Sequence, residues 1–272
     1  MPCFPELKVA GQQMVAPGCY RLTLSSVELS RLARPGQFLH VRVLPLSDPL
    51  LRRPFSVHAV ERQAGRVSLF YRVVGRGTAL LARKKEGDCL DVVGPLGRGF
   101  SFPAGKQPVA VVAGGIGVAP LFFLLQELAG EKNRDRVLYI LLGARTAEEL
   151  LLIDEIKELT GSVAGEFNVL AATGDGSYGH RGPVTELLER LLTGRMVDMV
   201  YACGPQDMLR SVSMLLEKHG VEGELSIEER MACGIGACFS CVCKTKSSDG
   251  EGFRYSRVCV EGPVFKAGEV IL

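Results

Sequence analysis

Short apolar runs separated by breaks rich in Gly, Pro and Ser make up the N-terminal part of the chain. The runs at 20–24, 38–43 and 66–73 are rich in β-branched and aromatic residues, which are typical of strands. Several short strands at this spacing predict a small antiparallel barrel. We place its end near residue 104, because residues 103–106 have the composition of a linker.

Beyond this linker, each apolar run leads into a turn that contains glycine. The run at 108–113 has the composition of a buried strand, and similar runs follow at 137–142 and 196–201. Apolar helical segments follow, at 121–128 after the first run and up to Leu216 after the third. Strand, turn and helix in this order predict a mostly parallel sheet with its ligand at the carboxyl ends of the strands.

The pattern therefore predicts a multidomain protein of class α/β and β. We expect a β-barrel over 1–104, a parallel-sheet α/β domain over 105–225 and a small C-terminal segment over 226–272. Residues 220–223 mark the exit from the second domain. The last segment is too short for a large core, so we expect it to depend on a bound metal group and on packing against the other domains.

Composition excludes several classes of function. The chain has 272 residues and 47% hydrophobic content, enough for two medium domains and a short appendage. Its net charge of +2 gives no reason to expect a nucleic-acid or membrane partner. The sequence has no apolar run of the roughly 18 residues that span a bilayer, and it does not begin like a signal peptide. Nine cysteines without a secretory signal favour the reducing cytoplasm.

Four of these cysteines have the spacing C-x4-C-x2-C-x17-C, which is the most specific pattern in the chain: Cys233, Cys238, Cys241 and Cys259. This is the spacing of a plant-type [2Fe–2S] cluster, in which a tight loop supplies three thiolates and a later segment the fourth. Residues 234–237 are small or flexible, which suits a backbone that curls around the cluster. We therefore expect these four cysteines to ligate a [2Fe–2S] cluster.

Other interpretations of the cysteines fit less well. Structural zinc usually uses C-x2-C pairs, and only Cys238 and Cys241 have that separation. An odd number of cysteines in a chain without a signal peptide argues against disulfides. One alternative stays open, because Cys243 would share a strand face with Cys241 and could replace it as a ligand, or could be a small buried neighbour.

Two segments of the predicted barrel have residue types that suit a flavin. In Arg53-Pro54-Phe55-Ser56, the arginine can hold a phosphate, the aromatic ring can stack and the serine can hydrogen-bond beside a flavin ring. Gly75-Arg76-Gly77-Thr78 follows the strand that ends in Tyr71-Arg72-Val73, and backbone amides at such a turn can bind phosphate. Each segment alone is equally typical of an ordinary turn.

Two glycine-containing turns of the α/β domain suit a dinucleotide. Gly114, Gly115 and Gly117 lie between a buried strand and a helix, where a pyrophosphate can meet the helix N-terminus. The run departs from G-x-G-x-x-G, so the ordinary dinucleotide fingerprint does not strictly apply. The turn 203–205, Cys-Gly-Pro, would by itself indicate only a strand-to-helix connection.

Taken in order, these motifs resemble the ferredoxin–NADP reductase superfamily, which combines a flavin-binding barrel with a nicotinamide-binding α/β domain. With Gly94-Pro95-Leu96-Gly97 and the cysteine segment added, nearly the whole chain resembles one family. That family is the electron transfer subunits of the NAD-dependent, class B dihydroorotate dehydrogenases. The cysteine segment is the most specific part of the match.

The resemblance implies three cofactors, FAD, NAD(H) and a [2Fe–2S] cluster, and assigns residues to each. The residues implied to line the FAD are Arg53, Pro54, Phe55 and Ser56, and those implied to pass beside its flavin are Tyr71, Arg72 and Val73. Those implied for its pyrophosphate are Gly77 and Thr78. Those implied for NAD(H) are Gly114, Gly115, Gly117, Cys203, Gly204 and Pro205. The family commonly has an acidic residue where this chain has Gly174, so any contact from the loop 173–179 to the dinucleotide stays open.

The resemblance also implies an activity in pyrimidine biosynthesis. Electrons from dihydroorotate, oxidised at FMN in a separate catalytic subunit, would pass through the cluster and FAD to NAD+, in an assembly with two copies of each subunit. The chain has no evident pyrimidine site, so we expect the cluster near the interface with that subunit. We expect no catalytic acid–base residues, and we interpret the four histidines as surface or structural residues: His40, His58, His180 and His219.

Two alternatives stay open at this level. Similar flavin and iron–sulfur subunits serve NADH-dependent ferredoxin:NADP oxidoreductases and cytoplasmic hydrogenases, and Arg145 could accept a 2′-phosphate whereas Glu148 and Glu149 would repel it. We favour NAD. A redox-sensing regulator would need a DNA-binding element or a basic stripe, and the sequence has neither.

Overall fold

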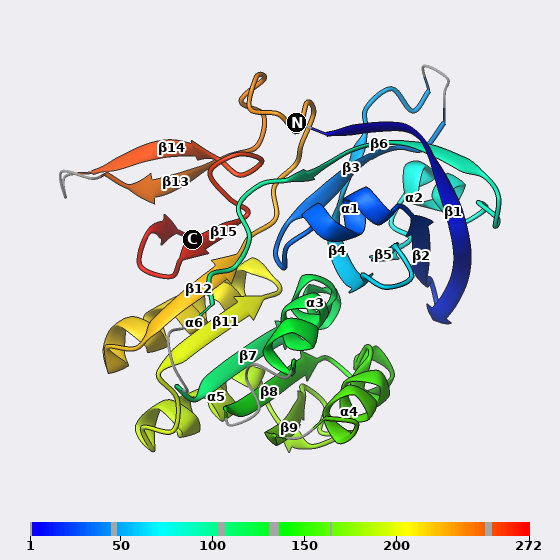
Figure 1. The fold of residues 1–272 in the computed structure, drawn as a ribbon. Coiled ribbons are helices and arrows are strands. Elements are labelled where there is room, and N and C mark those ends of the chain that lie inside the picture. Colours follow the sequence, from blue (N-terminus) through cyan, green and yellow to red (C-terminus); the bar gives the residue numbers. More distant parts are fainter. Residues whose placement is uncertain (1, 45–47, 103–106, 131–135, 164, 248–251) are drawn as a thin grey trace.

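The computed structural model describes residues 2–44, 48–102, 107–130, 136–163, 165–247 and 252–272. Its strands form a closed antiparallel barrel, a seven-stranded sheet and a small three-stranded sheet (Figure 1). The predicted fold class is therefore confirmed. The element types expected for the runs at 20–24, 38–43, 66–73, 108–113 and 137–142 are also confirmed.

The barrel closes in the order β1-β2-β5-β4-β3-β6. Its strands are β1 (Cys3–Ala16), β2 (Cys19–Ser25), β3 (Phe38–Arg42), β4 (Arg53–Glu61), β5 (Arg66–Arg72) and β6 (Cys89–Leu96), with short helices α1 (Val27–Leu32) and α2 (Arg76–Leu81). Alternate side chains of these strands fill the interior, among them the fully buried Leu22, Leu39, Val57 and Leu69. The barrel is thus a packed core, and its ligand must bind at the outer surface or rim.

The second sheet has the order β10-β9-β8-β7-β11-β12-β15, and it is parallel except at its last strand. Its strands are β7 (Val109–Gly114), β8 (Val137–Ala144), β9 (Glu166–Thr173), β10 (His180–Arg181), β11 (Met199–Cys203), β12 (Glu222–Ser226) and β15 (Val264–Lys266). The helices are α3 (Val118–Leu128), α4 (Ile153–Gly161), α5 (Val184–Thr193) and α6 (Gln206–His219), with single turns η1 (Gly115–Gly117) and η3 (Ala147–Glu149).

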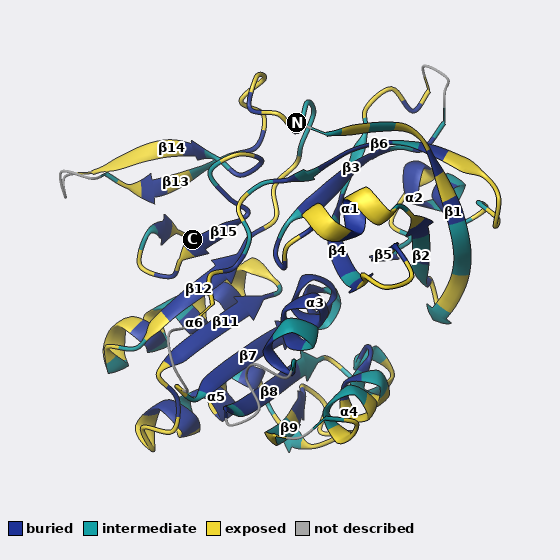
Figure 2. Ribbon diagram, in the orientation of Figure 1, coloured by how far each residue is buried: buried dark blue, intermediate teal, exposed yellow. Residues whose placement is uncertain are grey.

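Helix α3 lies between the barrel and the α/β sheet, and nearly all of its residues are buried (Figure 2). It begins at Val118, earlier than the predicted Leu121, because Pro120 fits a first turn, where a missing N–H costs no helical bond. His58 of β4 ties the two domains together, since its Nδ1 lies 3.1 Å from the carbonyl oxygen of Ala119.

The C-terminal segment is joined to both larger units. Its own sheet has the order β14-β13-β16, with β13 (Val242–Lys246), β14 (Phe253–Arg257) and β16 (Val270–Ile271). Strand β15, from the same segment, pairs antiparallel with β12 and so extends the α/β sheet. The boundaries predicted near residues 104 and 225 stay predictions: residue 104 lies outside the described residues, and β12 ends at Ser226.

Candidate functional site

A cleft of about 310 Å³ opens where the barrel, helix α3 and the segment after β12 meet. Most residues predicted to surround a flavin line it: Arg53, Pro54, Phe55, Ser56, Tyr71, Arg72 and Thr78. Val73 and Gly77 are not part of this lining, whereas Val74 is. The far wall comes from Ile116 and Pro120 of the glycine-rich turn predicted for the dinucleotide and from Ile227 and Met231, which no motif contains. The residues that line this cleft fit a flat, partly aromatic ligand held against the barrel.

Arg53 and Gly77 lie in direct contact at one end of this cleft. A methyl group on Gly77 would come within 2.5 Å of the Nε atom of Arg53, so a larger residue there would displace the guanidinium. Arg53 also donates a hydrogen bond to the carbonyl of Leu51, which holds its side chain over the first turn of α2. A guanidinium placed beside the first turn of a helix is suited to a phosphate group.

Thr78 shapes the same turn through its hydroxyl. Its Oγ1 accepts hydrogen bonds from the amides of Val74 (2.9 Å) and Gly75 (3.2 Å) and donates one to the carbonyl of Gly75 (2.9 Å). The hydroxyl is therefore occupied by the backbone. Thr78 contributes the shape of the turn and part of the cleft wall, and a phosphate there would bind to main-chain groups.

Tyr71 and Phe55 form the aromatic wall of the cleft. Their ring centroids are 5.3 Å apart, and Tyr71 also stacks on Tyr20 at 6.0 Å. The Tyr71 hydroxyl accepts a hydrogen bond of 2.7 Å from Nε2 of Gln12. Burial raises the pKa of Tyr71 to about 12, so the phenol stays neutral. Tyr71 is thus a fixed, uncharged surface for a ring system.

A second cleft, of about 680 Å³, lies at the carboxyl ends of the parallel strands. The predicted dinucleotide residues on its wall are Gly114, Gly115, Gly117, Gly204 and Pro205. Cys203 is buried and does not line it. Instead, its carbonyl lies so close to Gly117 that a methyl group on Gly117 would come within 2.2 Å of the oxygen. Burial raises the pKa of the Cys203 thiol, so this residue packs rather than reacts.

The two clefts share three residues: Arg72, Ile116 and Glu228. Glu228 was not predicted, because no motif contains it. Its position does carry a signal, since it follows the carboxyl end of β12 by two residues, where parallel sheets bind ligands. Desolvation by the surrounding protein raises the pKa of this carboxyl group, although part of the residue is reachable from solvent. Glu228 therefore stands where ligands of the two clefts would meet.

The four predicted cluster ligands lie on two stretches of chain, the loop between β12 and β13 and the turn after β14. Sγ of Cys233 accepts hydrogen bonds from the amides of Ile235 (3.5 Å) and Cys238 (3.4 Å). The hydroxyl of Ser240, 3.3 Å from the Cys238 sulfur, lowers the pKa of that thiol to about 6. Cys241 and Cys259 are buried beside each other, and burial, with Cys241 as neighbour, raises the pKa of Cys259 to about 12.

These contacts sort the cysteines into two pairs, 233 with 238 and 241 with 259. Among the described residues, no group of three or more His, Cys, Asp or Glu side chains surrounds a point where one metal ion could be held. A two-iron cluster has a different requirement, because its four thiolates spread over two metals. Donor type, pairing and amide N–H groups aimed at sulfur all fit such a cluster.

Cys243 lies apart from the contacts that join the four predicted ligands. It is half-buried on β13, opposite Ser256 of β14, and it lines a third cleft together with Pro205 and Tyr255. Burial raises its pKa to about 11. Cys241, two residues earlier, is the one beside Cys259.

Three of the four histidines contact other parts of the protein through packing or hydrogen bonds. His40 and His58 are buried, and burial lowers the pKa of His40 to about 4 and that of His58 to about 3. The ring of His58 packs between Phe70 and Phe122. His180 bonds to Glu186 at 2.5 Å. The ring of His40 contacts the cluster loop at Gly234.

Exposed apolar side chains gather around the cysteine loop. Ile235 is 48% exposed, Phe239 58% and Val260 45%, so each offers a large apolar surface to solvent. We name these three residues the cluster-loop patch. Apolar groups exposed together in this way are typical of a surface that binds another protein.

The loop at the far end of the dinucleotide cleft holds Arg145 in an ion pair. Its Nε and Nη2 donate to Glu149 at 3.0 and 2.6 Å. Asp175 bonds to Ser177 within its own turn. A side chain at Gly174 would have room, since a methyl group there would lie 3.5 Å from the nearest atom, the carbonyl oxygen of Arg145. Arg145 would have to leave Glu149 in order to bind a 2′-phosphate.

The described helices include none that is both long and apolar enough to cross a membrane.

Three families of known domains match the chain in sequence order. Residues 14–100 match the oxidoreductase FAD-binding domain, and 111–214 match the oxidoreductase NAD-binding domain. Residues 228–271 match the iron–sulfur cluster binding domain of dihydroorotate dehydrogenase B. Each matched range contains the residues that the sequence predicts for the corresponding cofactor.

Several curated proteins are similar over nearly their whole length. A dihydroorotate dehydrogenase B (NAD(+)) electron transfer subunit from Desulforamulus reducens is 45% identical over 98% of this chain and 97% of that protein. Subunits with the same name from Bacillus caldolyticus and Enterococcus faecalis are each 43% identical over 98% of this chain.

Solved structures show the same architecture. One described as an NADH-dependent reduced ferredoxin-NADP oxidoreductase matches all of this chain and 91% of its own, with a TM-score of 0.82 and 29% identity. A ferredoxin NADP+ reductase from Neisseria gonorrhoeae, with 19% identity and a TM-score of 0.66 over 81% of this chain, shares the fold.

Proposed function

The chain belongs to the family of electron transfer subunits of dihydroorotate dehydrogenase B (NAD+), and we propose that it carries electrons between a catalytic partner subunit and NAD(H) in pyrimidine biosynthesis. The observation that carries this proposal is the junction at Glu228. There the barrel cleft and the dinucleotide cleft share a wall, and the same segment continues directly to Cys233.

When bound, nicotinamide exchanges a hydride, an iron–sulfur cluster exchanges single electrons and a flavin exchanges either, so the flavin belongs between the other two. In this proposal Arg53 and the first turn of α2 bind the FAD pyrophosphate. Phe55 and Tyr71 orient its ring system, and the cleft walls exclude water from it. Gly114, Gly115, Gly117, Gly204 and Pro205 leave room for the dinucleotide, and Cys203 holds Gly117 in place.

Cys233, Cys238, Cys241 and Cys259 would hold a [2Fe–2S] cluster. The amides of Ile235 and Cys238 already point at the Cys233 sulfur, which is how proteins stabilise the charge of thiolate ligands. The proposed function requires no side chain of this site to act as a general acid or base. The residues bind and orient three redox groups along one path.

We propose that the partner is an FMN-containing catalytic subunit that oxidises dihydroorotate, in an assembly with two copies of each subunit. The cluster-loop patch is the surface we assign to it, because Ile235, Phe239 and Val260 lie on the loops that carry the cysteines. Electrons would enter there and leave to NAD+. The nine free cysteines favour the reducing cytoplasm as the location.

A second candidate function rests on the match to the NADH-dependent reduced ferredoxin-NADP oxidoreductase structure, which spans the whole chain. In that function the partner would be a different oxidoreductase. The ion pair between Arg145 and Glu149 argues against a site that favours a 2′-phosphate. The two candidate functions differ in the partner protein and not in the cofactors that this chain would bind.

The test is reconstitution with a dihydroorotate dehydrogenase catalytic subunit under anaerobic conditions. We expect dihydroorotate and NAD+ to yield orotate and NADH only when both subunits are present. A Cys259→Ser variant mixed in the same way should yield no NADH while its FAD remains reducible by NADH. If the wild-type pair transfers no electrons although each subunit is fully loaded, the assignment to this partner is wrong.

A further inference from the structure

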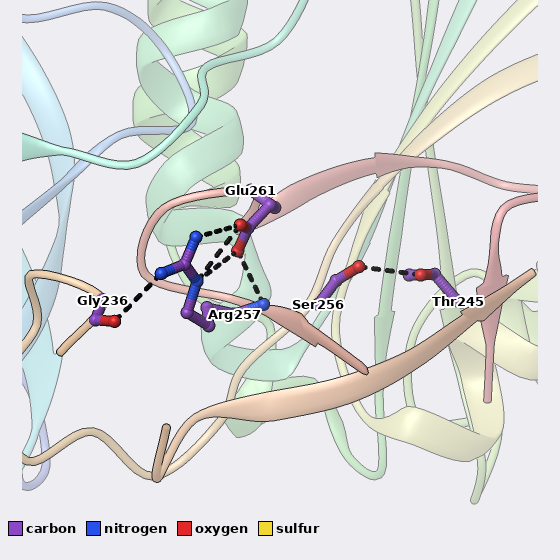
Figure 3. Close-up of polar contacts among 5 residues, drawn as sticks. All are labelled: Gly236, Thr245, Ser256, Arg257 and Glu261. Carbon is purple, nitrogen blue, oxygen red and sulfur yellow. Dashed lines mark hydrogen bonds and ion pairs between the residues drawn. The ribbon is translucent and has the colours of Figure 1, made fainter. Parts of the chain in front are cut away.

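Arg257 connects the two stretches of chain that carry the cluster cysteines (Figure 3). Its Nη1 donates a 3.0 Å hydrogen bond to the carbonyl of Gly236, in the loop between Cys233 and Cys238. Its Nε and Nη2 donate to both carboxylate oxygens of Glu261, at 3.1, 3.1 and 2.5 Å, in the turn just beyond Cys259. One guanidinium therefore joins the first ligand loop to the segment of the last ligand.

The hairpin of β13 and β14 aims Arg257 at the loop. Ser256 points inward and its hydroxyl lies 2.7 Å from that of Thr245, both fully or nearly fully buried. Because side chains alternate along a strand, the neighbouring Arg257 must point to the opposite face. Its own amide also donates to Glu261 Oε2 at 2.7 Å, so backbone and side chain hold the same carboxylate.

The loop passes very close to this pair of residues. Gly236 has φ +83, and a methyl group there would come within 2.7 Å of Val260 Cγ2 and 3.3 Å of Arg257 Nη1. The guanidinium also lies 5.3 Å from the ring centroid of Phe239, within the range of a cation–π contact. Arg257 is consequently held in one place on both sides.

Within this pair, the guanidinium is the group that bonds to the cysteine loop, through the carbonyl of Gly236. The carboxylate of Glu261 bonds to the guanidinium and to the amide of Arg257. The positive charge is therefore fixed on the loop that carries Cys233 and Cys238.

We propose that Arg257 is a positioning residue that fastens the cysteine loop to the Cys259 turn and that its charge raises the reduction potential of the cluster. This inference rests on the proposed function, since it requires the four cysteines to hold an iron–sulfur cluster. One-electron reduction adds one negative charge to the metal group. A fixed cation close by stabilises that charge more than it stabilises the oxidised form.

The experiment compares four variants of the full chain loaded with FAD and cluster. Arg257→Gln removes the charge, and Arg257→Lys keeps the charge but loses the fork geometry. Glu261→Gln removes the opposing charge. Arg254→Gln is the matched control, because Arg254 lies on the same strand, is exposed and pairs with Glu269 at 3.6 Å, away from the loop. Iron and sulfide analysis comes first, followed by a redox titration monitored by EPR.

We expect Arg257→Gln to shift the equilibrium toward the oxidised cluster by about tenfold, which is about 59 mV lower for one electron. Glu261→Gln should shift it in the opposite direction, and Arg254→Gln should leave it unchanged. Arg257→Lys should keep most of the potential. Both Arg257 variants should speed hydrogen exchange at the amides of Ile235 and Cys238.

Equal potentials in Arg257→Gln and Arg254→Gln would overturn the inference, as would shifts of the same sign in Arg257→Gln and Glu261→Gln. If Arg257→Gln does not retain its cluster, the potentials of Glu261→Gln and Arg257→Lys test the inference instead. A potential in Glu261→Gln equal to that of the wild type would also overturn the inference. Wild-type protein that cannot bind iron and sulfide would instead refute the proposed function, which separates the two failures.

Discussion

The imidazole ring of His40 lies directly against Gly234, so that a methyl group on Gly234 would come within 2.5 Å of the ring's Nδ1 atom. His40 belongs to barrel strand β3 and pairs with Pro54 of strand β4, while Gly234 follows Cys233 in the chain. Burial, and next the charge of Arg52, lower the pKa of His40 to about 4, so the ring is neutral near pH 7. The barrel and the cluster loop are thus packed on each other through one uncharged side chain.

Gly234→Ala should therefore cost more than backbone strain alone. Gly234 has φ +70, and Gly18 in the β1–β2 turn has φ +69 but nothing within 4 Å of a methyl group. Gly18→Ala should lower the free energy of unfolding by about 1–2 kcal/mol. Gly234→Ala should lower it further and reduce the iron content, since the loop must move away from His40. Equal effects of the two changes, measured by urea unfolding and iron analysis, would contradict the packing role of His40.

Arg53→Gln should weaken FAD binding by at least about tenfold, because it removes a charged partner of the pyrophosphate. Gly77→Ala should act in the same direction, since its methyl group would meet Arg53 Nε at 2.5 Å. Arg76→Gln serves as the control, because Arg76 is exposed and pairs with Asp48 at 2.6 Å. Flavin fluorescence titration measures all three. FAD affinity unchanged in Arg53→Gln would remove Arg53 from the site.

Glu228→Gln should discriminate between the two forms of the nicotinamide cofactor. A carboxylate at the junction of the clefts stabilises the positively charged ring of NAD+ and not the neutral ring of NADH. We expect NAD+ to bind about fivefold more weakly and NADH to change less than about twofold. Glu229→Gln is the control, because Glu229 lines the flavin cleft but not the dinucleotide cleft. Calorimetric titration that shows equal losses for both forms would contradict this role.

His58 should make stability depend on pH. Its pKa is about 3 in the folded protein and 6.5 as the ordinary value, because burial disfavours the charged ring. The folded state therefore binds fewer protons than the unfolded state, and stability falls as the pH drops from 6.5 toward 3. Between about pH 7.5 and about pH 5.5 the loss from this residue should be about 1.4 kcal/mol.

His58→Phe keeps an aromatic ring beside Phe70 and Phe122 but cannot be protonated. Urea unfolding of the loaded protein at both pH values should show a smaller pH dependence for this variant. Identical slopes for the variant and the wild type would mean that His58 is not the group responsible.

The local pattern of apolar residues and glycines predicted the buried strands. A strand such as β7 is apolar throughout, and a glycine-containing turn marks its end. Met196 to Asp198 are not in β11 although their composition suits a strand, because β11 starts only where Met199 pairs with Val109 of β7. Strand β15 could not be expected either, since its pairing with β12 depends on a long-range return of the chain.

The candidate site divides in the same way. The predicted ligand cysteines and turn glycines can be recognised from their spacing in the sequence. Cluster ligation requires thiolates, and close contacts of the backbone leave room for few residues other than glycine. No sequence motif identifies Glu228, His40 or Arg257. His40 and Arg257 contact residues that are distant in sequence, and Glu228 lies on a wall shared by two clefts. Only the packing of the barrel, the sheet and the C-terminal hairpin brings those neighbours together.

The most direct test of the account is an anaerobic titration of the purified chain with NADH, after analysis for flavin, iron and sulfide. We expect about one FAD and about two irons per chain, and NADH should reduce the flavin and then produce the EPR signal of a reduced [2Fe–2S] cluster. Protein that binds FAD and is reduced by NADH but contains no iron would contradict the assignment of the four cysteines and, with it, the proposed electron path.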